Sequence, residues 1–172
     1  LVSDGYQKRY EHYLTYQVSL DGLEETHDKL RQKPGSFKKI TENLRRLAEL
    51  MNTEPYFRVV VLTNINKDNY EEIEPLWDYL WNEIGVEHTF DIVRGVGFSV
   101  WNLPKNIAEE GDPRDCALPP LDKLDEIVET IKHINARESG CFDQFIRQME
   151  IQVNLYLGRK TPYRCLTAGR TV

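Results

Sequence analysis

Apolar residues recur along the chain with two different periods. Short strand candidates lie near 17–20, at 57–62 and near 88–93. The second of these runs, FRVVVL, is nearly continuous in apolar and β-branched residues, which is typical of a strand that is covered on both faces in a parallel sheet. Between and after the runs, apolar residues recur every three or four positions, as on the buried side of an amphipathic helix. The alternation predicts strand-helix-strand units.

The predicted helices have start and stop residues of the expected kinds. Ser36 is in the N-cap position of the first helix, and Asn69 with Glu72 has the spacing of a capping box at the start of the second. Gly85 is expected to end that second helix. Four helices are predicted, over residues 37–51, from Asn69 to Gly85, over 121–136 and over 142–157.

The order of these elements indicates an α/β fold. Crossovers of this length join parallel strands into right-handed βαβ units, so the architecture is an open doubly wound sheet or part of a barrel. In both, the loops that follow the strands gather on one rim. Residues 95–120 contain four prolines and no clear period, which favours a lid or binding segment, with a short helix near Lys105–Glu110 as the alternative.

Composition excludes several classes of protein. With 172 residues, 40% of them hydrophobic, the chain is long enough to bury a core. The formal charge of −6, and basic pairs interleaved with acids, argue against binding of nucleic acid. No run of about 18 apolar residues or signal peptide is present, so we expect no membrane span and a cytoplasmic protein. The odd count of three cysteines fits a reducing compartment.

Candidate chemistry lies where the first strand ends, in the stretch VSLDGLEETHDKLR. Taken singly, each residue has an ordinary interpretation. Ser19 alternates with apolar neighbours and is consistent with a structural hydroxyl, and Asp21-Gly22 with a turn. The pair His27-Asp28 fits a loop or a helix start, and Arg31 fits a surface residue paired with Asp28 or Glu24.

Taken together, the string is more specific. VSLDG, followed by HD, an arginine, PGSF and a helix with NLRRL, resembles the fourth strand and its loop in radical S-adenosylmethionine (radical SAM) enzymes of the SPASM or twitch type. VVVLTNINKDN resembles the fifth strand of that family, FDIVRG the sixth, and PYRCLTAGRTV the opening of the cysteine-rich extension. The resemblance covers almost the whole chain.

The resemblance implies a partial (β/α)6 TIM-like barrel. Residues 1–120 would be the C-terminal half of that barrel, and residues 121–172 a helical segment that leads into a truncated cysteine-rich extension. The family reaction is reductive cleavage of S-adenosylmethionine to a 5′-deoxyadenosyl radical, which abstracts hydrogen from a substrate. The extension implies a peptide or protein substrate.

The resemblance also implies roles for individual residues. Ser19 and Arg31 match residues that hold the methionyl carboxylate of S-adenosylmethionine. Asp21 matches a residue that organises the rim loop. Ile92 lies where the family backbone receives the edge of the adenine, so its side chain would pack in the core. Cys165 matches the first ligand of an auxiliary iron-sulfur cluster, since thiolates suit such clusters.

The departures from the family pattern are equally informative. The chain has no CxxxCxxC segment, which in the family binds the 4Fe-4S cluster, and no GGE-like segment. Cys116 and Cys141 lack ligand spacing and are expected to be free thiols, and His27 is expected to bond the backbone in its loop. By itself the chain should be inactive. We expect a segment cut from a longer enzyme, with a degenerate paralogue as the alternative.

Two other functions remain open at this stage. The chain could be a non-catalytic interaction domain that keeps the barrel rim and binds a peptide or partner enzyme. An unrelated phosphate-binding barrel is disfavoured, because the rim lacks a glycine-rich helix start.

A half-barrel leads to a prediction about association. Its open sheet edges and uncovered apolar face should make the chain form a homodimer or aggregate. Sedimentation velocity over a range of concentrations is expected to show a species larger than the monomer. A stable compact monomer at high concentration would contradict the half-barrel interpretation.

Overall fold

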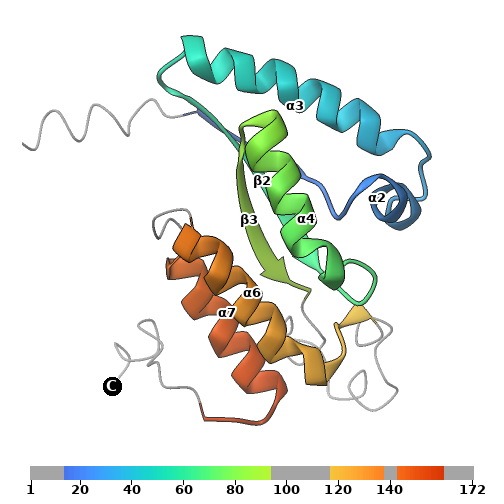
Figure 1. The fold of residues 1–172 in the computed structure, drawn as a ribbon, viewed down its shortest axis with the longest axis vertical. Coiled ribbons are helices and arrows are strands. Elements are labelled where there is room, and N and C mark those ends of the chain that lie inside the picture. Colours follow the sequence, from blue (N-terminus) through green and yellow to red (C-terminus); the bar gives the residue numbers. More distant parts are fainter. Residues whose placement is uncertain (1–13, 94–116, 138–142, 161–172) are drawn as a thin grey trace, which may run out of the picture. The chain divides into compact units, whose positions relative to one another are not determined.

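The structure is a computed structural model that describes residues 14–93, 117–137 and 143–160. The fold is α/β, as predicted, with a three-stranded parallel sheet and five helices among the described residues (Figure 1). These residues fall into two compact units. The first unit contains 14–64 and 71–90, and the second contains 65–70, 91–93, 117–137 and 143–160. The predicted boundary at residue 120 stays a prediction.

The sheet has the order β1-β2-β3, with strands β1 Leu14–Ser19, β2 Phe57–Ile65 and β3 Glu87–Ile92. β1 runs parallel to β2, and its last residue, Ser19, is paired with Leu62. β2 continues to Ile65, although the sequence predicted a loop from Thr63. The strand continues because its side chains keep alternating, with Thr63 and Ile65 both buried.

All predicted helices are present among the described residues, and one helix was missed. The observed helices are α2 Glu24–Leu30, α3 Ser36–Thr53, α4 Ile73–Asp78 with a π-helical continuation Tyr79–Ile84, α6 Leu124–Arg137 and α7 Asp143–Tyr156. Short 3-10 turns precede α4 and α6, at Tyr70–Glu72 and Leu121–Lys123. Gly85, with a φ of 78°, ends the π-helical segment as expected. The HD pair, interpreted from the sequence as a loop or a helix start, lies inside α2.

The predicted N-cap of α3 is wrong. Gly35 holds the N-cap position, and Ser36 is the first helical residue. The carboxylate of Asp28 performs the capping instead: Oδ1 accepts hydrogen bonds of 2.8 Å from the Phe37 amide and from the Ser36 hydroxyl, and Oδ2 accepts one from the Gly35 amide. An ionised carboxylate at a helix start is favoured by the free amides and by the helix dipole.

The predicted capping box of Asn69 and Glu72 is also wrong. Asn69 accepts a hydrogen bond from the Asn66 amide at 2.7 Å. Glu72 caps a different helix, because its carboxylate accepts the Leu23 amide at 2.8 Å and the Thr26 hydroxyl at 2.6 Å, at the start of α2. Capping rules that consider neighbouring residues alone do not include partners this distant in sequence.

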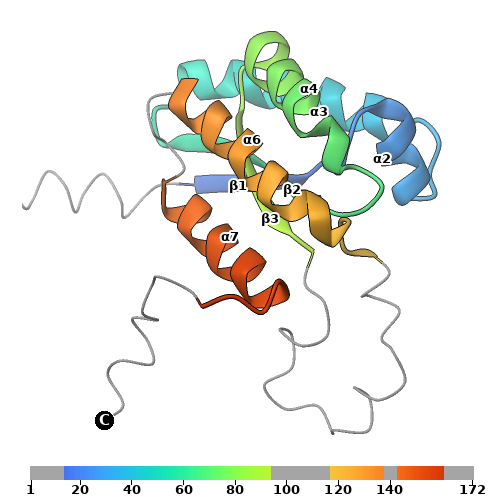
Figure 2. The same cartoon turned by 60° about the horizontal axis from the view of Figure 1, so that its bottom comes forward.

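The core of the first unit lies between the strands and the helices α3 and α4, which lie side by side on one face of β1 and β2 (Figure 2). The inward-facing residues of β2, Val59 and Val61, are fully buried, as are Leu44 of α3 and Leu80 of the π-helical segment. Full burial of such a side chain contributes about 1.5–3 kcal/mol. These contacts fix the carboxyl end of β1 in place.

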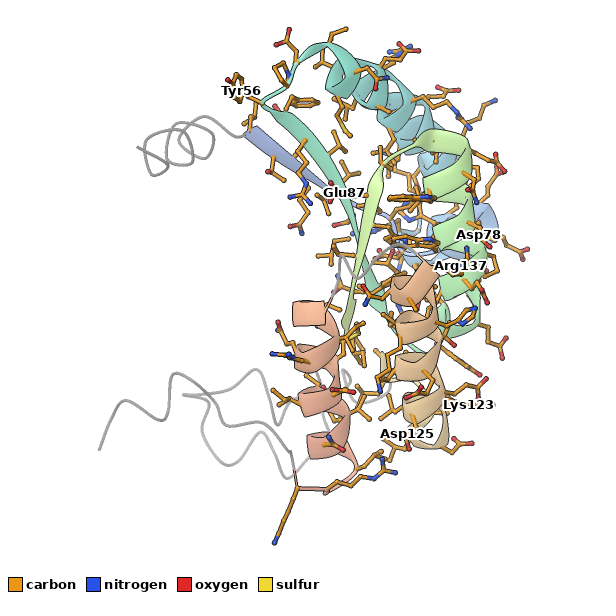
Figure 3. The ribbon with its side chains drawn as sticks, turned by 60° about the vertical axis from the view of Figure 1, so that its left-hand side comes forward. Tyr56, Asp78, Glu87, Lys123, Asp125 and Arg137 are labelled. Carbon is orange, nitrogen blue, oxygen red and sulfur yellow. The ribbon has the colours of Figure 1, made fainter. Side chains whose placement is uncertain are left out.

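The outer strand β1 is much less covered. Leu14 and Tyr16 are 57% and 50% exposed, and Tyr56 in the turn before β2 is 51% exposed (Figure 3). At the same end of the sheet, Arg58 of β2 donates a 2.8 Å hydrogen bond to Glu87, the first residue of β3. The uncovered apolar side chains fit the predicted association, which stays a prediction.

In the second unit, α6 and α7 pack against each other. Their buried residues are Leu124, Ile127, Val128, Ile131 and Ile134 on α6, and Ile146, Met149 and Val153 on α7. Lys132 lies 2.8 Å from the carboxylates of both Glu129 and Glu150. Asp125, near the start of α6 (Figure 3), pairs with Arg159 at 2.8 Å.

A buried polar chain connects the three strands. The Thr63 hydroxyl donates to the Leu20 carbonyl at 2.5 Å and lies 2.7 Å from Nε2 of His88. Since the hydroxyl has one hydrogen, His88 Nε2 is the donor. The His88 ring contacts Trp77 and Phe90, with ring centroids 5.7 and 4.1 Å away. Burial lowers the pKa of His88 to about 3.

This histidine predicts an acid limit to stability. The folded pKa of His88, about 3, lies below the ordinary 6.5, so protonation favours the unfolded chain. The contribution of neutral His88 to the free energy of unfolding should be complete above pH 6.5. Below that pH it should fall by about 1.4 kcal/mol per pH unit towards pH 3. Urea unfolding across this range is expected to show a flatter pH dependence in His88→Phe than in wild type. Equal slopes in wild type and His88→Phe would contradict the assignment.

Candidate functional site

A cavity of about 600 Å³ opens at the carboxyl end of β1. Its wall combines the end of the strand, the helix α2, the turn after α2 and the first turns of α3. The residues with hydrogen-bonding or charged side chains in this wall are Ser19, His27, Arg31, Lys33, Ser36, Lys39 and Asn43. Ser19 and Arg31, which the sequence singled out 12 positions apart, therefore line the same cavity.

The pairing of β1 with β2 determines where Ser19 lies. The ladder extends one residue past the strand, with the Leu20 amide donating to the Leu62 carbonyl at 3.2 Å. Leu20 is fully buried, whereas Ser19 is exposed, as the alternation of side chains along a strand requires. The chain then turns at Asp21-Gly22 into α2.

Asp21 holds Arg31 across α2. The Arg31 guanidinium lies 2.5 Å from Asp21 Oδ2, with the arginine side chain 45% exposed and that of the aspartate 10% exposed. Arg31 is also the C-cap residue of α2, and its amide donates to the His27 carbonyl at 2.9 Å. The sequence interpretation considered Asp28 and Glu24 as partners of Arg31, and the structure gives Asp21 instead. This ion pair provides a contact by which Asp21 can organise the loop.

His27 is the most deeply buried residue of this wall. Its Nδ1 accepts the Asp21 amide at 3.0 Å, so the prediction that His27 bonds the backbone is confirmed, although in a helix. Nδ1 therefore carries no hydrogen and Nε2 carries one. Burial is the main cause that lowers the pKa of His27, so the ring is neutral near pH 7. Nε2 is buried and has no hydrogen-bond partner among the described residues.

The start of α2 depends on a close approach of two chain segments. A Cβ at Gly22 would lie 2.7 Å from the Glu72 carboxylate and 2.8 Å from the Thr26 methyl group. Only a residue without a side chain allows Glu72 to reach the Leu23 amide and the Thr26 hydroxyl. Gly22 and Glu72 therefore position α2, and with it His27 and Arg31.

The charge of the wall is positive. Arg31, Lys33 and Lys39 supply three cationic groups. Asp28 lies nearby, but hydrogen bonds from the Phe37 amide, then the Ser36 hydroxyl and the Gly35 amide, lower its pKa and engage its oxygens at the start of α3. The arrangement can accept an anionic group such as a carboxylate.

Sequence reasoning missed part of this wall. The pair Lys38-Lys39 looked like a solvated helix face, yet Lys39 lines the cavity. The proline and glycine before α3 gave a signal that Lys33 lies at a turn, but nothing in the sequence connected Glu72 with α2. The buried donor of His27 became visible only with the fold.

The other predicted site residues are not among those that line the cavity. Ile92 is fully buried, as expected of a packing side chain, but belongs to the second unit. Cys165, Cys116 and Cys141 lie outside the described residues, as does most of the predicted lid at 95–120. Within the described ranges, no group of three or more His, Cys, Asp or Glu side chains is arranged to hold a metal ion. None of the described helices is long and apolar enough to cross a membrane.

Comparison with known proteins gives one match of limited extent. A stretch of 60 residues is 33% identical to sporulation killing factor maturation protein SkfB of Bacillus subtilis (strain 168). The match covers 35% of this chain and spans 13% of the length of SkfB. No family model matches the chain. No solved structure matches it either.

The close approach at Gly22 can be tested by substitution. Gly22→Ala should destabilise the first unit, because the new methyl group displaces Glu72 from the start of α2. Gly85→Ala is the matched control: it also has a positive φ, of 78°, but nothing lies within 4 Å of its Cβ position. We expect Gly22→Ala to cost about 1–3 kcal/mol more than Gly85→Ala in urea unfolding. Equal costs would show that the contact with Glu72 does not matter.

Proposed function

We propose that this chain is part of a radical SAM enzyme, and that the cavity at the end of β1 binds the amino-acid end of S-adenosylmethionine. The observation that carries the proposal is that Ser19 and Arg31 line one cavity. The resemblance assigned these two residues to the same carboxylate from the sequence alone. The match to SkfB supports the same family, over the limited stretch that it covers.

The chemistry of the wall suits a carboxylate. A guanidinium binds a carboxylate through charge-assisted and often bidentate hydrogen bonds, each contributing about 1.5–3 kcal/mol. Arg31 is half exposed, so the lower end of this range applies in the open cavity. Its pairing with Asp21 keeps the guanidinium in place before the ligand arrives. The Ser19 hydroxyl can donate to a second carboxylate oxygen.

The two cofactors of the family fit the described residues differently. S-adenosylmethionine fits, with Ser19 and Arg31 as its carboxylate ligands, and in the family it is the source of 5′-deoxyadenosyl radical chemistry. The 4Fe-4S cluster does not fit, because the described residues contain no ligand set and the chain has no CxxxCxxC segment. We therefore assign no step of the reaction to a cluster on this chain. Its residues bind and orient the cosubstrate.

The substrate class that we propose is a peptide or protein. SkfB is named for the maturation of sporulation killing factor, and we propose a substrate of the same kind for this chain. A cysteine-rich extension beginning at Cys165 would point the same way. Auxiliary cluster binding by Cys165 remains part of the proposal.

A second candidate is a binding domain without catalysis. It rests on the same cationic wall, which can hold a carboxylate whether or not a reaction follows. In that case the cavity would bind a carboxylate of a partner without any cleavage of S-adenosylmethionine.

The test uses the full-length protein that contains this segment, reconstituted with iron and sulfide without oxygen and then reduced. We expect formation of 5′-deoxyadenosine from S-adenosylmethionine. Arg31→Ala should lower the product at least tenfold, and Ser19→Ala should lower it severalfold, because both weaken carboxylate binding.

Arg46→Ala is the control, since Arg46 is exposed on α3 and does not line the cavity. It should keep full product formation. A folded protein that binds no iron and forms no 5′-deoxyadenosine would overturn the proposal and favour the binding domain. If product formation is unchanged in both Arg31→Ala and Ser19→Ala, the cavity does not bind S-adenosylmethionine.

A further inference from the structure

Basic residues are concentrated around the cavity although the chain as a whole is acidic. The formal net charge is −6. The 13 residues from Lys29 to Thr41 nevertheless contain five basic residues and no acidic one. Three of the five line the cavity, namely Arg31, Lys33 and Lys39.

The three cations are not equivalent. Arg31 is already paired with Asp21, at 2.5 Å. Lys33 and Lys39 form no ion pair within the described residues, so their charges are available to a ligand. They approach the cavity from different elements, Lys33 from the turn after α2 and Lys39 from the second turn of α3.

A buried donor independently indicates a ligand. His27 is 0% exposed, it is one of the residues that line the cavity, and Nε2–H has no hydrogen-bond partner among the described residues. A buried donor without a partner costs about 1–3 kcal/mol, and an anionic oxygen in the cavity would remove that cost. The hydrogen bond from the Asp21 amide to Nδ1 keeps Nε2 in the donor state.

S-adenosylmethionine does not account for these groups. Its one anionic group is the methionyl carboxylate, which the proposed function assigns to Ser19 and Arg31. The sulfonium and the amino group are cationic, and two lysines beside them would repel them. The groups that remain can bind a second anion.

We propose that Lys33, Lys39 and His27 Nε2–H form a second anion subsite, which binds the carboxylate of an acidic residue in a peptide substrate. The inference rests on the proposed function for the peptide nature of the substrate. Two ammonium groups and one neutral donor match one or two carboxylates. A nucleic acid would need a longer basic surface, and the formal net charge of −6 on the whole chain would repel a polyanion.

The test measures peptide binding by the full-length protein, by fluorescence polarisation. The probe is a labelled octapeptide with two adjacent glutamates, and its matched counterpart has glutamines at the same positions. We expect the glutamate peptide to bind at least tenfold more tightly. Lys33→Gln combined with Lys39→Gln should remove that difference.

Two further variants separate the subsite from general charge and from folding. Lys38→Gln changes a neighbouring exposed lysine that does not line the cavity, and should weaken binding less than twofold. His27→Asn retains an acceptor for the Asp21 amide but has no Nε2–H, so we expect severalfold weaker binding with the circular dichroism spectrum unchanged.

Several outcomes would overturn the inference. Equal affinity for the two peptides would do so, and so would an equal loss in Lys38→Gln and in the double lysine variant. Displacement of the labelled peptide by inorganic phosphate, at a phosphate concentration no higher than the dissociation constant of the peptide, would show that the subsite binds phosphate instead.

The result also separates the inference from the proposed function. Peptide binding needs neither iron nor S-adenosylmethionine. Selective glutamate binding by a protein that forms no 5′-deoxyadenosine would sustain the subsite and overturn the enzyme proposal. Formation of 5′-deoxyadenosine without any preference for the glutamate peptide would do the reverse.

Discussion

The cavity depends on a helix that is too short to be stable alone. An isolated helix of seven residues does not pay its nucleation cost in water, so α2 exists because other parts of the chain hold it. Glu72 holds its start, through the Leu23 amide and the Thr26 hydroxyl. Asp28, on α2 itself, then holds the start of α3. One carboxylate from beyond β2 thus determines the placement of both helices that surround the cavity.

These carboxylates also shape the electrostatics of the site. Asp21 and Asp28 lie close to the cavity, but each is committed, one to Arg31 and the other to the first amides of α3. Their charges are balanced locally by groups that they contact. The lysines of the wall have no such balance within the described residues. A strongly acidic chain can therefore present a positive cavity without any change in its overall charge.

The sequence was sufficient to predict the elements with a clear period. The strand β2 and the helices α3, α6 and α7 were predicted because enough apolar residues repeat in each to define a buried face. The helix α2 was missed since two turns contain too few repeats, and its stabilising partner Glu72 is 49 positions from Leu23. Ser36 and Asn69 were misassigned as caps because the two capping carboxylates are distant in sequence from the amides that they cap. Ser19 and Arg31 were found through family resemblance, and no periodicity would have joined them.

The register of β1 has a consequence for how the chain can vary. Ser19 is paired with Leu62 and directly precedes the buried Leu20. Because side chains alternate along a strand, Ser19 faces the cavity. Loss or gain of one residue within β1 would turn Ser19 away and bring an apolar neighbour to the wall. The exposed side chains of β1 are free to change in identity, but the length of the strand is not. Insertions would be tolerated instead at the other end of the sheet, in the turn between α3 and β2, where Glu54 and Pro55 are exposed.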